Sequence, residues 1–148
     1  MASEKPPFLA AIPSHLAHVN GIRAFLVSVC KVYSIETEVV DALALAVHEA
    51  ITNIIRHSHH HHEELRVEMH IFPREDCLEI HLLDEGPTFD ITQVPELDPA
   101  ELRVGGRGVF LIRTILDEAS TMPRPSGRGN ILRLVKRCTP KAPMPSDG

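Results

Sequence analysis

Three polar residues at four-residue spacing are the first feature of this chain that could do chemistry. Glu49, Asn53 and His57 lie in the segment D-A-L-A-L-A-V-H-E-A-I-T-N-I-I-R-H, residues 41–57. Residues four apart in an α-helix lie within about 40° of one another around the axis, so these side chains would form one stripe. Packing does not require a carboxylate, an amide and an imidazole in one row. The alternative is the solvated face of an amphipathic helix, and the rest of the chain must decide.

A second candidate is the segment D-E-G-P-T-F-D, residues 84–90, directly after an apolar run. The Asp84 carboxylate could accept a hydrogen bond from an exocyclic amine, and Gly86 would let a planar ring lie close to the backbone. An ordinary Asp-x-Gly turn is the alternative.

A third candidate is the glycine cluster V-G-G-R-G-V, residues 104–109, before the predicted helix 109–116. Backbone N–H groups and the dipole at a helix N-terminus suit phosphate, and Arg107 adds a full charge. The cluster is neither a Walker A motif nor a dinucleotide fingerprint, because no Gly-Lys-Ser/Thr follows and the glycine spacing differs. Residues 91–103 between the two segments are predicted to form a loop over a site.

The internal run S-H-H-H-H-E-E, residues 58–64, raises the question of a metal site. Adjacent imidazoles on a flexible segment seldom make a defined site, so a polar loop is the favoured interpretation.

The apolar periodicity predicts the elements that position these residues. An edge strand is expected at residues 8–12, a helix at 14–33 with Ser14 as its N-cap, and a second helix beginning near Glu36 or Glu38. Strands at 65–72 and 77–83 should form an antiparallel hairpin, and a last strand is expected at 130–135. The fold class predicted is α+β, a two-layer α/β sandwich with helices on one face of a mostly antiparallel sheet. One domain should span residues 8–137, and residues 138–148 should be a disordered tail.

Composition excludes several classes of function. The chain has 148 residues and a net charge of -5, which argues against direct nucleic-acid binding. Three widely spaced cysteines indicate reduced thiols rather than disulfides or a zinc knuckle. No apolar run approaches the ~20 residues that span a bilayer, so no membrane partner and a cytoplasmic location are expected.

The ordered set of motifs resembles a known family. The stretches E-A-I-T-N-I-I-R-H, D-E-G-P-T-F-D, G-G-R-G-V-F-L-I-R-T-I-L-D-E and G-N-I-L-R-L-V-K are similar to the ATP-binding boxes of the gyrase and histidine-kinase type (GHKL, Bergerat fold) of ATPases. Within this superfamily, the chain resembles the anti-sigma factor serine/threonine-protein kinases. The resemblance implies the histidine-kinase-like ATPase fold, with ATP and Mg²⁺ as cofactors.

The resemblance also implies roles for individual residues. Asn53 matches the asparagine that holds Mg²⁺, and Glu49 matches the catalytic base. Asp84 matches the aspartate that recognises the adenine amine, and Gly86 matches its neighbouring glycine. Asn130 departs from the commonest pattern, in which threonine follows the glycine near the adenine.

The remaining expected nucleotide contacts are spread over three segments. Arg56 and His57 match positions that line the phosphates and the ribose, and Phe89 belongs to the adenine-binding segment. The glycine segment supplies the lid and phosphate contacts, for which the expected residues are Arg103, Gly105, Gly106, Arg107, Gly108 and Val109.

The function that the resemblance implies is an ATP-dependent kinase that phosphorylates an anti-sigma factor antagonist and sequesters a sigma factor. Three alternatives stay open: a nucleotide-gated binding module without kinase activity, the detached ATP-binding half of a histidine kinase, and a degenerate relative that binds no nucleotide. A homodimer is compatible with the family. The sequence does not name the sigma factor, the antagonist or the residue that is phosphorylated.

Overall fold

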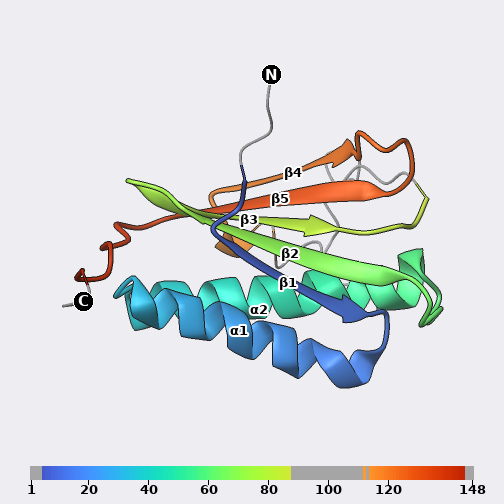
Figure 1. Ribbon diagram of the computed structural model, residues 1–148, viewed down its shortest axis with the longest axis horizontal. Coiled ribbons are helices and arrows are strands. Elements are labelled where there is room, and N and C mark those ends of the chain that lie inside the picture. The colour runs from blue at the N-terminus through green and yellow to red at the C-terminus, as the bar shows by residue number, and fades with distance from the viewer. Residues whose placement is uncertain (1–4, 88–111, 113, 146–148) are drawn as a thin grey trace.

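The computed structural model describes residues 5–87, 112 and 114–145, which form a five-stranded sheet over two long helices (Figure 1). The strands are β1 (Phe8–Pro13), β2 (Arg66–Pro73), β3 (Cys77–Leu83), β4 (Glu118–Pro123) and β5 (Asn130–Arg137). The helices are α1 (Val19–Val32) and α2 (Thr37–Asn53), with a 3₁₀ turn η1 (Leu16–His18) before α1 and a π-helix η2 (Ile54–Ser58) after α2. The strand order is β1-β2-β3-β5-β4, and each neighbouring pair is antiparallel.

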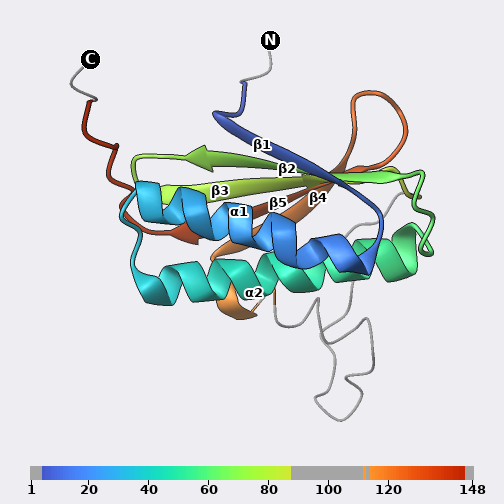
Figure 2. The same ribbon diagram turned by 60° about the horizontal axis from the view of Figure 1, so that its bottom comes forward.

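Both helices cover the same face of the sheet, as Figure 2 shows. The core lies between the two layers, where one row of fully buried side chains crosses three strands: Ile71 pairs with Ile80, and Ile80 pairs with Leu134. Helix α2 packs Leu43, Val47 and Ile51 into this core. Apolar side chains repeat every second residue in the strands and every three or four in the helices, so both layers present one apolar face. The predicted α+β sandwich is therefore confirmed.

Strand β4 is an addition to the expected order of elements. Its sequence E-A-S-T-M-P has no apolar alternation, and all six of its residues are only partly buried or exposed. β4 pairs with β5 alone among the described strands, so it lies at an edge of the sheet. An edge strand is stabilised mainly by backbone hydrogen bonds to one neighbour, which leave no hydrophobic signature in the sequence.

The start of the first helix is also corrected. Ser14 is not its N-cap: the side chain of His15 caps η1 by accepting a hydrogen bond from the Ala17 N–H, 2.9 Å away. The Ser14 hydroxyl instead lies 2.9 Å from the ring of His59. Helix α2 begins at Thr37, between the two expected start points.

The structure describes only part of the predicted helix 109–116 and of the predicted tail 138–148. Of the predicted helix 109–116, Ile112, Thr114 and Ile115 are described and are helical, and the Leu116 N–H bonds to the Ile112 carbonyl at 3.1 Å. After β5, residues 138–145 form no helix or strand, and the Lys141 N–H donates to the Tyr33 carbonyl at the end of α1.

The cysteines are free thiols, and burial is the larger cause that raises the pKa of Cys30 to about 11. A thiol with so high a pKa stays protonated near neutral pH. Within the described part of the chain, none of the helices combines the length and apolar character needed to cross a bilayer.

Truncation of Ile80 tests the position of the core. We expect Ile80→Ala to lower the free energy of unfolding by about 2–5 kcal/mol, because the substitution leaves a cavity in the centre of the sheet. The matched control Ile80→Val should cost only about 0.5–1.5 kcal/mol. Urea denaturation followed by circular dichroism measures both, and equal midpoints for Ile80→Ala and the unchanged protein would contradict the assigned register.

Candidate active site

The Asp84 carboxylate is the centre of the hydrogen-bond network at the end of β3. Its side chain is buried, with 5% of the residue exposed. One carboxylate oxygen, Oδ1, accepts from the Gly86 N–H at 2.9 Å, from the Asn130 N–H at 3.2 Å and from the Asn130 side-chain amide at 3.1 Å. Among the described residues, no donor reaches Oδ2. Because three donors of the protein bind Oδ1, the side chain of Asp84 has a fixed orientation, and with respect to the described residues Oδ2 can still accept a hydrogen bond.

Asn130 bonds to two parts of this segment. Besides its contacts to Asp84 Oδ1, its Nδ2 donates to the Pro87 carbonyl at 2.7 Å. Its own carbonyl accepts from the Asp84 N–H at 2.9 Å. An amide side chain carries two donor hydrogens, so it can hold the carboxylate and the next turn together, which a threonine hydroxyl with one donor cannot do.

Gly129 lets the hairpin between β4 and β5 approach Asp84. Its φ of +95° lies in the region that side chains rarely adopt, and a Cβ there would lie 2.0 Å from the Asp84 carbonyl oxygen. Arg124, at the other side of the hairpin, donates from Nη1 to that same carbonyl at 3.1 Å. The Asp84 carbonyl is therefore bound by Arg124 and closely approached by Gly129.

Gly86 joins the Asp84 segment to the end of the second helix. A Cβ at this position would lie 1.8 Å from Ser58 Oγ, so no larger residue fits without displacing Ser58. Ser58 is the last residue of η2, which continues α2. The contact brings the sheet part and the helix part of the site together, and both α2 and β3 end at the same side of the molecule (Figure 1).

Glu49 and Asn53 lie on α2 as it approaches this contact. Asn53 precedes Ser58 by five residues, or about 7 Å along a helix axis, and Glu49 lies one further turn away. Both side chains are half-buried, and neither has a hydrogen bond or ion pair with a described residue. A half-buried carboxylate and amide that have no partners among the described residues are suited to bind a ligand. Their predicted placement on one helix is confirmed.

The helix changes its winding directly after Asn53. In η2 the His59 N–H bonds to the Ile54 carbonyl, five residues earlier, at 2.7 Å, and such π turns are frequent at functional sites. Arg56 and His57 lie in this wider turn and are exposed. The expected contacts Phe89, Arg103, Gly105, Gly106, Arg107, Gly108 and Val109 lie outside the described residues.

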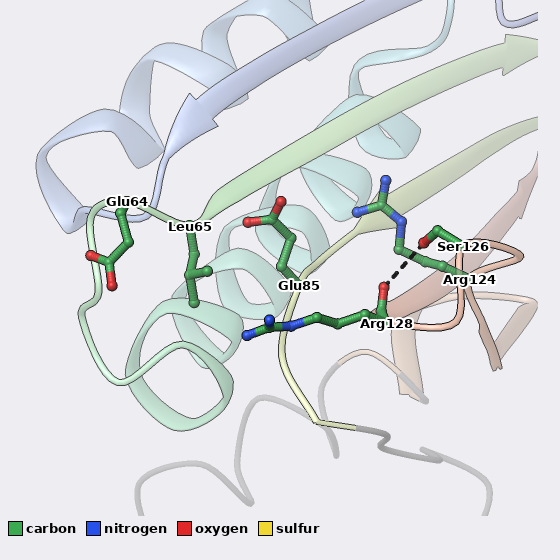
Figure 3. A pocket seen from close by; sticks show the side chains of 6 residues that line it. All are labelled: Glu64, Leu65, Glu85, Arg124, Ser126 and Arg128. Carbon is green, nitrogen blue, oxygen red and sulfur yellow. Dashed lines mark hydrogen bonds between the residues drawn. The ribbon is translucent and has the colours of Figure 1, made fainter.

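Beside the Asp84 segment lies a pocket of about 350 Å³ that the sequence pattern did not indicate (Figure 3). The pocket is lined by the turn before β2, by the residue after Asp84 and by the β4–β5 hairpin, in residues Glu64, Leu65, Glu85, Arg124, Ser126 and Arg128. Its charged residues come from three separate segments, so no local motif could reveal it.

The histidine run contains a residue that the favoured interpretation missed. His60, His61 and His62 are exposed, as expected for a polar loop, but His59 is buried, with 1% exposed. Within the described part of the chain, no three His, Cys, Asp or Glu side chains are grouped closely enough to hold a metal ion. The only signal for His59 was its position just after the apolar stripe of the helix.

Similarity to known proteins agrees with this geometry. Residues 12–136 match the family of histidine kinase-like ATPase domains. The chain is 34% identical over 128 residues to the serine-protein kinase RsbW of Listeria innocua, with 80% of each chain covered. It is 30% identical over 115 residues to the RsbW proteins of Oceanobacillus iheyensis and Bacillus subtilis, with 72% of this chain covered in both cases. The chain therefore belongs to the family of histidine kinase-like ATPase domains and, within it, to the serine-protein kinase family that the RsbW proteins represent, as the resemblance to anti-sigma factor kinases predicted.

Proposed function

We propose that this protein is an Mg²⁺-ATP-dependent serine/threonine kinase that phosphorylates an anti-sigma factor antagonist and, when free of it, sequesters a sigma factor. ATP use follows from the family. The choice of protein substrate rests on the names of the relatives, which are serine-protein kinases, and on the resemblance described above. We expect the activity in the cytoplasm, where ATP and sigma factors are found.

The observation that carries the proposal is the arrangement around Asp84. Its Oδ1 is occupied by three N–H donors of the protein, and its Oδ2 has no described partner. Oδ2 can accept a hydrogen bond, and the exocyclic amine of adenine is a donor of the right kind for it. Gly86 gives the ring access to the backbone at the same place.

The proposed phosphate end of the site is α2. Asn53 offers an uncharged amide oxygen, a ligand type that Mg²⁺ accepts, and the ion would neutralise charge on the triphosphate when bound. Glu49, one turn earlier, is the proposed base that accepts the proton of the serine or threonine hydroxyl. Phosphoryl transfer depends mainly on alignment and charge, so this small set of side chains is adequate.

Incubation with γ-labelled ATP tests the function directly. The substrate is the antagonist protein recovered on the immobilised kinase from an extract of the native cells. We expect label on a serine or threonine of the antagonist, stable to acid. An acid-labile phosphohistidine would favour the histidine-kinase alternative, and ATP binding without any transfer would favour the nucleotide-gated binding module.

Asp84→Asn tests adenine recognition. Asparagine has only one side-chain oxygen. If its NH2 group takes the position of Oδ1, three donors of the protein lose their acceptor, and if it takes the position of Oδ2, the adenine amine loses its acceptor. We expect ATP affinity to fall by about 1–3 kcal/mol, roughly 5- to 150-fold, in calorimetric titration with Mg²⁺ present.

Glu85→Gln is the matched control for Asp84→Asn. Glu85 Oε2 accepts from the Arg66 N–H at 2.9 Å, a bond that the glutamine oxygen can also accept. This neighbouring neutralisation should leave ATP affinity within about twofold of the original value. Equal losses in the two variants would indicate a general effect of charge rather than recognition by Asp84.

Glu49→Gln separates chemistry from binding. The variant keeps the shape of the side chain and removes the base, so we expect transfer to slow by about 100-fold or more while ATP affinity changes little. Single-turnover transfer to the antagonist and calorimetric titration measure the two quantities. Transfer at an unchanged rate would show that Glu49 is not the base.

A further inference from the structure

His59 is the most enclosed histidine in the described part of the chain, and both its ring nitrogens are engaged. Its Nδ1 lies 2.9 Å from the hydroxyl of Ser14, a residue with 0% exposure at the junction between β1 and η1. Its Nε2 lies 2.9 Å from the backbone nitrogen of Glu85, the residue between Asp84 and Gly86. One imidazole thus connects the N-terminal part of the chain to the segment after β3.

The two partners define the protonation state of the ring. The Glu85 N–H is only a donor, so Nε2 must accept and carries no hydrogen. The single ring hydrogen is then on Nδ1, where it is donated to Ser14 Oγ. A protonated imidazolium has no acceptor nitrogen, so the Nε2–H of His59 would point at the backbone N–H of Glu85 and the hydrogen bond between them would be lost.

The three consecutive amides of the Asp84 segment are held from three directions. The Asp84 N–H bonds to the Asn130 carbonyl on β5, and the Gly86 N–H bonds to the Asp84 side chain. The Glu85 N–H is the one that is held from the helix side, by His59. The other described hydrogen bonds join the segment to β5 and, through Glu85 Oε2, to Arg66 of β2. Without the His59 bond, the position of the segment relative to the end of the helix would depend on the packing of Gly86 on Ser58.

The charges around His59 oppose one another. Burial, the largest cause, lowers the pKa of His59 below its ordinary 6.5, and the charge on His62 of the same turn lowers it further. Asp84 and Glu85, after β3, raise the pKa, but burial prevails. Ser14, which packs on the ring from the β1–η1 junction, is uncharged. The ring is therefore neutral at neutral pH, as the hydrogen bonds require.

We propose that neutral His59 is a positioning residue of the nucleotide site, which holds the Glu85 amide so that Asp84 and Gly86 face adenine correctly, and that its protonation releases this segment and weakens nucleotide binding. The proposal rests on the proposed function, because it takes the Asp84 segment as the adenine-binding part. His59 itself does not contact the ligand. It acts through the backbone between the two residues that do.

The direction of the pH effect follows from the lowered pKa. The folded protein prefers the neutral ring more strongly than the unfolded chain does, so the contribution of His59 to stability is fully present above pH 6.5. It is lost as the pH falls through the lower pKa of the folded state. Nucleotide affinity should follow the same direction, because the nucleotide requires the neutral arrangement.

Two substitutions separate the two hydrogen bonds of the ring. His59→Gln can place a side-chain oxygen near the position of Nε2, where it accepts from the Glu85 N–H and cannot be protonated. His59→Asn keeps a polar atom near the position of Nδ1, next to Ser14, but does not reach Glu85. His59→Gln therefore retains the proposed positioning bond and His59→Asn removes it, while both variants disturb the packing to a similar extent.

The experiment is calorimetric titration of the full chain with Mg²⁺-ADP at about pH 7.5 and about pH 5.0, on either side of the ordinary histidine pKa. At the higher pH we expect His59→Asn to bind about 5- to 10-fold more weakly than the unchanged protein, and His59→Gln to bind within about twofold. On acidification the unchanged protein should lose at least about fivefold more affinity than His59→Gln, which has no ring to protonate. Titration of the ADP phosphates cancels in this comparison.

Equal affinity of all three proteins at the higher pH, or the same loss of affinity on acidification in the unchanged protein and His59→Gln, would overturn the proposal. Melting temperatures measured in parallel identify a purely structural role, which would lower the stability of both variants without the difference in pH dependence. Failure of the proposed function gives a different result, namely no ADP binding by the unchanged protein. In that case the ¹⁵N shifts of the His59 ring and the exchange rate of the Glu85 amide still show whether the hydrogen bond exists.

Discussion

The site depends on the three hydrogen bonds accepted by one oxygen of the Asp84 carboxylate. These bonds join the end of β3, the turn at Gly86 and the first residue of β5, which are brought together only by the pairing of β3 with β5. Gly129 and Arg124 hold the backbone carbonyl of the same residue. Because the protein fully occupies one oxygen, the direction of the other is set before any ligand binds, and the site pays little ordering entropy on binding.

The candidate site has one part on the sheet and another part on helix α2. The proposed adenine end is built on the central strands, whose side chains form the core, while Glu49 and Asn53 lie on α2 in the other layer. The two layers share the hydrophobic core, and near the site they also meet through Gly86 on Ser58 and His59 on Glu85. A ligand that contacts both parts would stabilise their relative position, so bound nucleotide should increase the stability of the whole domain and not only of its loops.

The sequence predicted the layers well and the hydrogen bonds between distant segments poorly. The apolar rows through Ile71, Ile80 and Leu134 follow from periodicity, because side-chain direction alternates regardless of what lies nearby. Strand β4 is polar and paired on one side, so periodicity could not reveal it. Ser14 fits the pattern of an N-cap, but its hydroxyl is used by a histidine 45 residues away, a contact that no local rule contains.

The candidate site shows the same division. Asp84 and Gly86 could be proposed as site residues because both belong to one short motif, Asp-x-Gly, directly after an apolar strand. The use of Asn130 as a clamp on Asp84, and of His59 as a support for Glu85, depends on distant segments meeting in the fold. The motifs indicated no specific role for these two positions, since the resemblance implies threonine rather than asparagine at position 130 and a histidine run is typical of a loop.

The π turn after Asn53 also limits where residues can be inserted or deleted in this part of the chain. A π turn has one residue more than an α-turn, and removal of one residue between 54 and 58 would rotate all that follows by about 100° around the helix axis. Ser58 would then lose its contact with Gly86, and His59 would lose its hydrogen bond to the Glu85 N–H. Ser58 and His59 nevertheless lie next to a surface turn that by itself tolerates changes in length. Insertions and deletions should therefore be tolerated among residues 60–64 but not at residues 54–59. The histidine-rich stretch, which looks like one continuous linker in the sequence, thus contains a boundary between positions that tolerate changes in length and positions that do not.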